Sequence, residues 1–125
     1  MNYLAHIYLS GDSKEIKVGN FIGDFVKGNQ HQHFPEKVAY GIILHRRIDS
    51  FTDQHSAVRE CIQLLRPGYG KYAGIVADIF FDHFLASNWK DYSMDSLHHF
   101  TKNAHAIFLS NFGFCHSRSN SFFLF

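Results

Sequence analysis

The chain has 125 residues, and its 12 lysines and arginines against 11 aspartates and glutamates give a net charge of +1 with histidine neutral. A chain of this length fits one domain and can bury a core without a disulfide framework. The near-neutral charge argues against nucleic acid or an anionic membrane as a general partner. Ten histidines, in contrast, raise the expectation of metal chemistry.

Helical periodicity dominates the sequence, and no alternating strand pattern persists. The predicted helices span residues 1–9, 14–27, 36–52, 56–65, 71–89 and 94–109. Residues 28–34 are polar and predict a loop. The expected fold is therefore all-α, with one helical bundle domain over residues 1–109.

Several residues mark the expected helix ends. Asn2 and Ser93 are candidate N-caps, and Pro35 suits the first turn of a helix. Pro67, followed by Gly68, should end the fourth helix.

Two segments depart from this regular pattern. Gly19 and Gly23 each weaken helix 14–27 by about 1 kcal/mol, so we expect close packing or close backbone approach there. Residues 110–125 hold four serines, five phenylalanines and no acidic residue, without a helical or strand period. They predict an atypical tail outside the helical domain.

The cysteines and the N-terminus bear on location. Cys61 and Cys115 are isolated and outside any CxxC motif, which predicts reduced thiols. Residues 1–12 lack a basic start, and His6 interrupts their apolar run, so we expect no signal peptide. No run approaches the roughly 18 apolar residues of a membrane span. The expected location is the cytoplasm.

The first candidate site lies on helix 36–52. His45, Asp49 and Asp53 are spaced four apart, so their side chains point roughly the same way. An imidazole and carboxylates at this spacing can hold a divalent cation. Mixed nitrogen and oxygen donors suit manganese, iron or zinc, whereas magnesium prefers oxygen. The competing interpretation is an exposed face with an ordinary His–Asp pair.

The second candidate site lies on helix 71–89. Asp78 and Asp82 share a face, and His83 lies about 100° around the helix from Asp82. Their neighbours are strongly apolar, so these groups are costly to place there unless they are paired or bound to metal. The alternative is that both carboxylates face solvent.

Two further residues extend these clusters. Asp24 is flanked by apolar residues and predicts either an inward-facing ligand or a surface acid. His6 stands alone on an apolar segment, where spacing alone favours a packing role. Acids and imidazoles thus recur on several apolar helices, which is how helical bundles build metal sites. Ions held in this way activate water and stabilise phosphoryl oxygens.

At these residues the sequence resembles the acyl carrier protein phosphodiesterase family, also called ACP hydrolase. The resemblance extends from residue 1 to about residue 109. It is carried, in order, by MNYLAH at 1–6, GNFIGDFVKG at 19–28, GIILHRRIDSFTD at 41–53, and AGI at 73–75 with DIFFDHFL at 78–85.

The resemblance implies a helical fold related to the HD-type phosphohydrolases. It also implies hydrolysis of the 4′-phosphopantetheine arm from holo-acyl carrier protein, giving the apo form. A divalent metal is implied, with manganese expected and magnesium, iron or zinc as alternatives. Acyl carrier protein is the expected partner, without nucleic acid or membrane, and the oligomeric state is not predicted.

The resemblance also implies roles for individual residues. The catalytic candidates are Asp24, His45, Asp49 and His83. The candidate metal ligands are His6, Asp24, His45, Asp49, Asp78, Asp82 and His83. Arg46 and Arg47 are expected to contact the substrate, either at its phosphate or at the acidic surface of the carrier protein.

Family members are usually longer, and residues 110–125 do not resemble their continuation. Two other functions therefore stay open. The first is a metal phosphohydrolase that uses the same residues on a nucleotide or another small phosphodiester. The second is a truncated, inactive helical protein that binds a partner.

Overall fold

The computed structural model describes residues 1–111, and within this range it contains helices and no strand. This confirms the all-α prediction. The α-helices are α1 (Tyr3–Tyr8), α2 (Lys14–Ile22), α3 (Glu36–Gln54), α4 (Ser56–Tyr69), α5 (Ala73–Ser87) and α6 (Leu97–Ser110). The 3-10 turns are η1 (Gly23–Phe25), η2 (Gly28–His33), η3 (Gly70–Tyr72) and η4 (Trp89–Asp91). The predicted tail and Cys115 fall outside the described residues from residue 112 onward. No described helix has the length and apolar character needed to cross a membrane.

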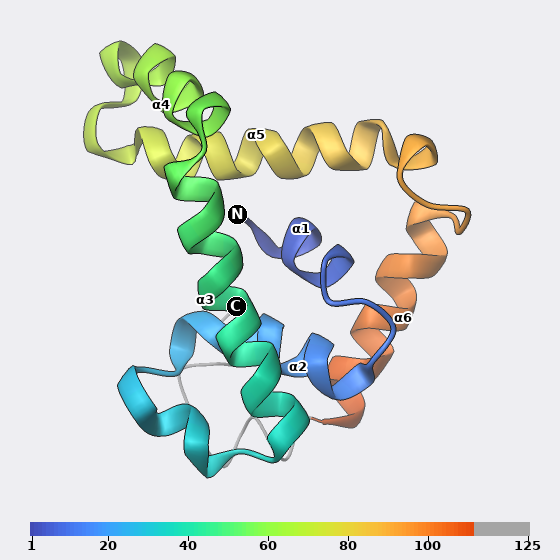
Figure 1. Cartoon of the computed structure of the whole chain (residues 1–125). Helices are drawn as coiled ribbons and strands as arrows, with labels where there is room; N and C mark the ends of the chain where they lie inside the picture. The colour runs from blue at the N-terminus through green and yellow to red at the C-terminus, as the bar shows by residue number, and fades with distance from the viewer. Residues whose placement is uncertain (112–125) are drawn as a thin grey trace.

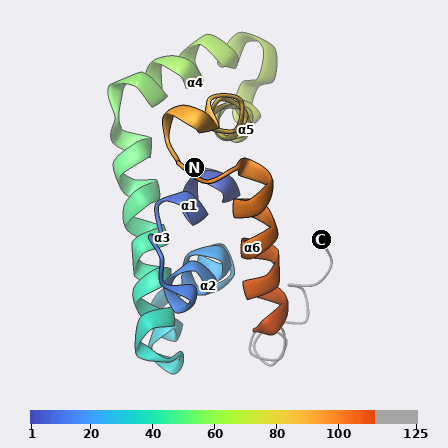
Figure 2. The same cartoon turned by 90° about the vertical axis from the view of Figure 1, so that its right-hand side faces the viewer.

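Three helices frame the molecule. In Figure 1, α3 runs along one side, α5 crosses the top and α6 descends along the other side, with α1 and α2 between them. Turned by 90°, Figure 2 shows α1 and α2 between α3 and α6, with α5 seen nearly end-on above them. The first two helices are therefore the inner elements, and residues on α1 and α2 can meet residues on α3.

The contact between α2 and α3 is unusually close because a glycine lies on each side. A Cβ atom at Gly19 would overlap the Val38 carbonyl oxygen and lie 2.9 Å from the Gly41 Cα. A Cβ atom at Gly41 would overlap the Ile16 carbonyl oxygen. The two backbones can therefore touch only where side chains are absent, which confirms the close approach expected at Gly19.

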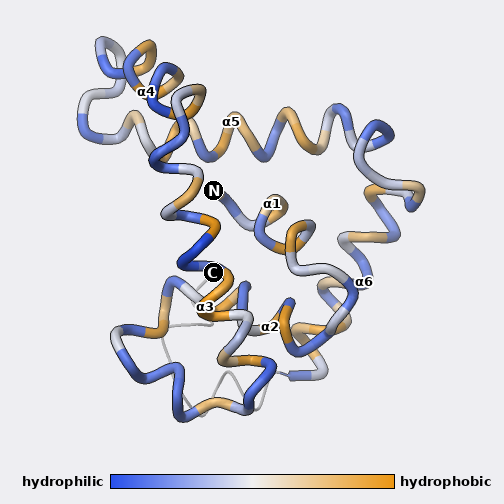
Figure 3. Tube along the Cα trace, viewed as in Figure 1, coloured by the Kyte–Doolittle hydropathy of each residue, from blue (hydrophilic) through white to orange (hydrophobic). Residues whose placement is uncertain are grey.

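Beside this contact lies the main apolar core. It is formed by the buried residues Ile22, Val26, Val38 and Ile42, with Phe21 and Phe34 packed against them. Figure 3 shows hydrophobic and hydrophilic residues alternating along α3 and α5. On α3 the apolar residues Val38 and Ile42 are buried, whereas on α5 Ile75, Ile79 and Phe84 are exposed. This core fixes α3 against α2.

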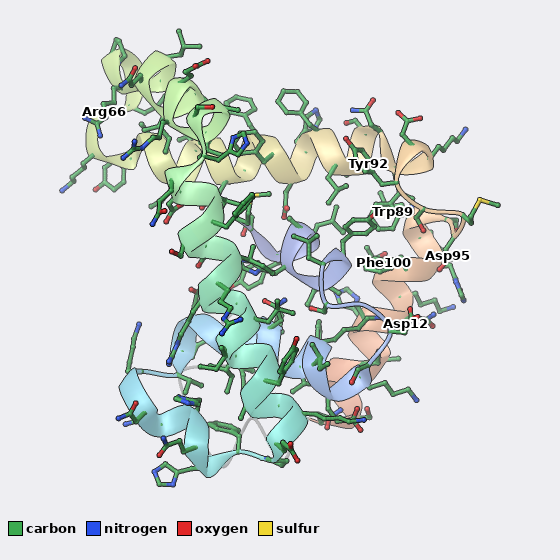
Figure 4. The ribbon with its side chains drawn as sticks, in the orientation of Figure 1. Asp12, Arg66, Trp89, Tyr92, Asp95 and Phe100 are labelled. Atoms are coloured by element: carbon green, nitrogen blue, oxygen red, sulfur yellow. The ribbon has the colours of Figure 1, made fainter. Side chains whose placement is uncertain are left out.

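An aromatic cluster holds the corner between α5 and α6. Trp89, Tyr92 and Phe100 gather there in Figure 4. The Trp89 and Phe100 ring centroids are 4.7 Å apart, and the Trp89 indole donates to the Asp95 carbonyl at 2.9 Å. From α1, the Tyr8 hydroxyl donates to the Tyr92 carbonyl at 2.8 Å. The end of α1 is thereby tied to this corner.

Some predicted helix ends were wrong. Pro67 lies inside α4, which continues to Tyr69. Proline removes only one N–H so close to the helix end, and the helix stops at Gly70, whose φ of +54° favours glycine. The loop predicted at 28–34 forms the short helix η2. Helix 14–27 ends at Ile22, where the chain tightens into η1.

One predicted cap was wrong, and another was right in position only. Ser96 caps α6 by accepting from the His99 amide at 3.1 Å, so this helix begins at Leu97. Ser93 instead accepts from the Asp95 amide. Asn2 lies at the N-cap position of α1, but its side chain makes no capping hydrogen bond.

Candidate metal centre

The centre of the site is His45, which projects from the middle of α3 and is only 4% exposed. Its Nδ1 lies 2.8 Å from the main-chain oxygen of Asn20 and 3.2 Å from that residue's Oδ1. Both partners are acceptors, so Nδ1 carries a proton. The other nitrogen, Nε2, lies 2.9 Å from Asp24 Oδ1 and 3.3 Å from Asp49 Oδ2. The ring therefore presents Nε2 to two carboxylates.

The position of this ring depends on Gly23. A Cβ atom at Gly23 would overlap the His45 ring and lie 2.8 Å from its Cδ2. A side chain at residue 23 would therefore displace the imidazole. This confirms the close packing expected at Gly23.

The second imidazole comes from α1. His6 is 1% exposed, and its Nε2 lies 3.0 Å from Asp49 Oδ1. Its ring stacks on that of His45, with centroids 3.9 Å apart and planes 10° from parallel. Asp49 therefore accepts from both histidines, and the two rings form one buried stack.

These side chains form a group that can hold a metal ion. One ligand atom from each of His6, His45 and Asp49 lies within 4.8 Å of the others. Because His45 Nδ1 is committed to Asn20, Nε2 is the nitrogen left for a ligand, an arrangement common around metal sites. Two imidazoles and a carboxylate suit manganese, iron or zinc. The residues thus fit the divalent ion expected from the sequence.

Further carboxylates surround this group. Asp24 lies at its exposed edge, with a side chain that is 61% exposed. The Met1 ammonium lies 3.2 Å from Asp49 Oδ1 and 3.2 Å from Asp78 Oδ1, and so connects α3 with α5. Burial lowers the pKa of this ammonium, but Asp78 and Asp49 outweigh that effect and raise it above its ordinary value. Burial also raises the pKa of Asp78.

The remaining predicted residues lie apart from the histidine stack. Asp82 accepts hydrogen bonds from the Leu4 and Ala5 amides, both at 2.9 Å, and so holds the start of α1. His83 is exposed, and its Nε2 lies 3.5 Å from Ser87 Oγ on the same helix. Asp53 is also exposed. Asp82 thus helps to position His6 indirectly, because it binds the first turn of the helix α1 that carries His6.

The two arginines have different surroundings. Arg46 donates to the Val26 carbonyl at 3.0 Å and is partly buried. Arg47 is exposed and lines a surface groove together with His31 and Tyr40. Only Arg47 therefore has its side chain in open solvent.

Sequence reasoning missed Asn20, which contacts both histidines. Its Nδ2 donates to the His6 carbonyl at 2.9 Å, and its two oxygens accept from His45. Neither its charge nor its spacing marked it in the sequence; its role follows from burial, because a buried amide needs several partners.

The metal-free site is strongly charged. Burial lowers the pKa of His45, but hydrogen bonds to Asp24 and Asp49 outweigh it and raise the pKa to about 9. The hydrogen bond to His45 holds the pKa of Asp24 below its usual range. Burial raises the pKa of Asp49, but His45 and His6 lower it further, to below its usual range.

The metal-free protein is expected to lose stability as the pH rises from 6.5 to about 9. A raised histidine pKa stabilises the fold fully below the ordinary value of 6.5, and this contribution is lost through the folded pKa of about 9. The lowered carboxylate pKa values act at the other end, where their contribution is lost as the pH falls below 3.8. Urea unfolding should show a decrease of about 2 kcal/mol across the alkaline window. A free energy of unfolding that does not change between pH 6.5 and 9 would contradict a charged His45 paired with Asp24 and Asp49.

The site lies within the segment that matches known proteins. A family model described as acyl carrier protein phosphodiesterase matches residues 1–124. Proteins named acyl carrier protein phosphodiesterase from Salmonella agona (strain SL483) and Salmonella newport (strain SL254) are each 41% identical over 107 residues. The aligned part is 85% of this chain and 55% of each relative, so the chain spans about half the length of these relatives. No solved structure matches significantly, and the relation to HD-type phosphohydrolases stays a prediction.

Proposed function

This chain belongs to the acyl carrier protein phosphodiesterase family, and we propose that it removes the 4′-phosphopantetheine arm from holo-acyl carrier protein. The observation that carries the proposal is the buried group of His6, His45 and Asp49, whose ligand atoms converge within 4.8 Å. A divalent metal ion can promote hydrolysis of a phosphodiester at neutral pH as a Lewis acid that also activates water. The three side chains of this group can supply the ligands of such an ion. A cytoplasmic location belongs to the same proposal.

In this proposal His6, His45 and Asp49 hold a divalent ion, with manganese expected. The bound ion supplies Lewis acidity toward a phosphoryl oxygen and toward water. Asn20 and Asp82 hold the ligands in place. Asn20 accepts a hydrogen bond from His45, and Asp82 accepts hydrogen bonds from the start of the helix that carries His6. The sequence prediction of Asp78, Asp82 and His83 as further ligands stays a prediction.

Asp24 is the carboxylate that a substrate can reach, because its side chain is 61% exposed. We assign it the proton of the attacking water, since it is the exposed carboxylate beside the metal group, with its Oδ1 2.9 Å from His45 Nε2. The water oxygen joins phosphorus, and the bond between phosphorus and the carrier protein's serine oxygen breaks. The serine oxygen takes up a proton, in net terms the one that Asp24 removed from water, which restores the apo-carrier protein, and the phosphate leaves on the pantetheine arm.

The acidic carrier protein would approach this exposed edge, where cations are present. Lys27 donates to the Asp24 main-chain oxygen and Arg46 to the Val26 carbonyl, both at 3.0 Å. Arg47 lines a separate groove with His31 and Tyr40, from which the contact expected from the sequence would be made. Charge complementarity of this kind steers association more than it adds to the chemical step.

Replacing Arg47 with alanine is expected to raise KM for holo-acyl carrier protein by about 3- to 10-fold and to weaken its salt dependence. The value of kcat should stay close to that of the unchanged protein, because Arg47 lies outside the histidine stack. Arg59→Ala, at an exposed position on α4, serves as the matched control. Equal KM values for the two variants, with equal salt dependence, would remove Arg47 from the docking surface.

The direct test is the intact mass of holo-acyl carrier protein after incubation with this protein, with and without manganese. Circular dichroism first establishes that the sample is folded. Manganese-dependent loss of the phosphopantetheine mass is the expected result. A panel of nucleotides and small phosphodiesters belongs in the same experiment, because turnover there without turnover of the carrier protein would replace the proposed substrate.

A further inference from the structure

Asn20 is the most enclosed polar side chain of the site. It is 0% exposed and lies on α2, between the helices that carry the two stacked histidines. Its Nδ2 donates to the His6 carbonyl at 2.9 Å and to Ser10 Oγ at 2.8 Å. Its Oδ1 lies 3.2 Å from His45 Nδ1, and its main-chain oxygen is 2.8 Å from the same nitrogen. One residue therefore contacts α1 and α3 at once.

The hydrogen bonds determine which way the amide points. The His6 carbonyl can only accept, so it selects the NH₂ end of the Asn20 side chain. The Oδ1 end must then face His45, where only a protonated Nδ1 can donate to it. The amide thus connects the His6 main chain to the protonated Nδ1 of His45, which the Asn20 main-chain oxygen also binds.

We propose that Asn20 is a positioning residue of the metal centre, which holds His6 and His45 in register and keeps His45 Nε2 as the ligand nitrogen. The inference rests on the proposed function, because it assumes that the His6–His45–Asp49 group binds a divalent ion. It adds a residue on a third helix that neither spacing nor charge singled out. Outer-shell partners of ligand histidines commonly act in this way.

A substitution at Asn20 tests the role if stability is controlled. Asn20→Ala removes the contacts of the amide to His6, Ser10 and His45, while the main-chain oxygen stays. Val18→Ala is the matched control, because Val18 is 1% exposed on the same helix and makes no contact with the histidines through a polar atom. Both variants lose buried packing on α2, but only the first loses the amide.

The readout is manganese affinity, measured by titration with electron paramagnetic resonance at a temperature where circular dichroism shows each protein folded. Asn20→Ala should bind manganese about 10- to 100-fold more weakly than the unchanged protein. Val18→Ala should stay within about threefold of it, since packing alone does not select a ligand nitrogen. Equal affinity in Asn20→Ala and the unchanged protein would overturn the role of Asn20 and leave the metal centre in place.

A second measurement needs no variant and can overturn the proposal even if Asn20→Ala does not fold. In the unchanged protein loaded with Zn²⁺, nitrogen-15 NMR of the imidazoles should show His45 bound through Nε2, with a proton on Nδ1. Coordination through Nδ1 would overturn the proposal. If the unchanged protein binds neither Mn²⁺ nor Zn²⁺, the metal centre itself is wrong and the role of Asn20 falls with it.

Discussion

Replacing His45 with alanine should abolish manganese-dependent release of phosphopantetheine, with a loss of at least about 100-fold. His45 supplies the only nitrogen that faces both Asp24 and Asp49 among the described residues. Its removal leaves Asp49 with one histidine partner and leaves Asp24 without its hydrogen bond to the stack. Because outer-shell partners alone change affinity or activity by about 10- to 100-fold, loss of a ligand should exceed that range.

The control for this variant is His99→Ala. His99 is exposed on α6, where its Nδ1 pairs with Asp95 at 2.6 Å, and it lies outside the stacked histidines. Turnover and manganese affinity are measured on both variants under identical conditions. Retained manganese-dependent turnover in His45→Ala would exclude this centre. Absence of turnover in the unchanged protein as well, with a change in stability alone in His45→Ala, would favour the inactive binding protein considered from the sequence.

Replacing Gly41 with alanine should destabilise the fold by about 3 kcal/mol. The added Cβ would overlap the Ile16 carbonyl oxygen and lie 2.9 Å from both the Asn20 nitrogen and the Gly19 Cα. These neighbours are main-chain atoms on α2, so the helices must separate to make room. Separation would also move Asn20 away from His45, so manganese affinity should fall with stability.

The matched control is Gly74→Ala on α5. A Cβ atom at Gly74 meets nothing within 4 Å, so alanine fits there without strain. Alanine is also favoured over glycine inside a helix by roughly 0.5–1 kcal/mol. Urea unfolding should therefore show a lower free energy of unfolding for Gly41→Ala and a higher one for Gly74→Ala, each compared with the unchanged protein. A neutral Gly41→Ala variant would contradict the close contact between α2 and α3.

Much of the fold was predictable because its signals are local. The apolar periodicity of each segment indicated six helices, and the glycines at 19 and 23 indicated close contacts. The helix ends were less predictable, since they depend on competition between neighbouring signals. Gly70 rather than Pro67 ends α4, and Ser96 rather than Ser93 caps α6.

The site was predictable only in part, because spacing along a helix groups residues by face without saying what the face meets. His45 and Asp49 share a face, and that face meets His6. Asp78 and Asp82 share another, yet the former faces the Met1 ammonium and the latter the amides of α1. Asn20 carries no charge, so its role depends entirely on the fold around it.

The support of α1 by Asp82 has a consequence for synthesis of the protein. α1 has six residues, too few for a helix that is stable alone, and the Leu4 amide is bound by a carboxylate 78 residues later. On the ribosome, His6 emerges well before Asp82, so a nascent chain that ends at α3 lacks the carboxylate that binds the start of α1. A product that stops after α3 would contain His6, His45 and Asp49 and is expected to hold a metal ion more weakly than the chain that includes α5.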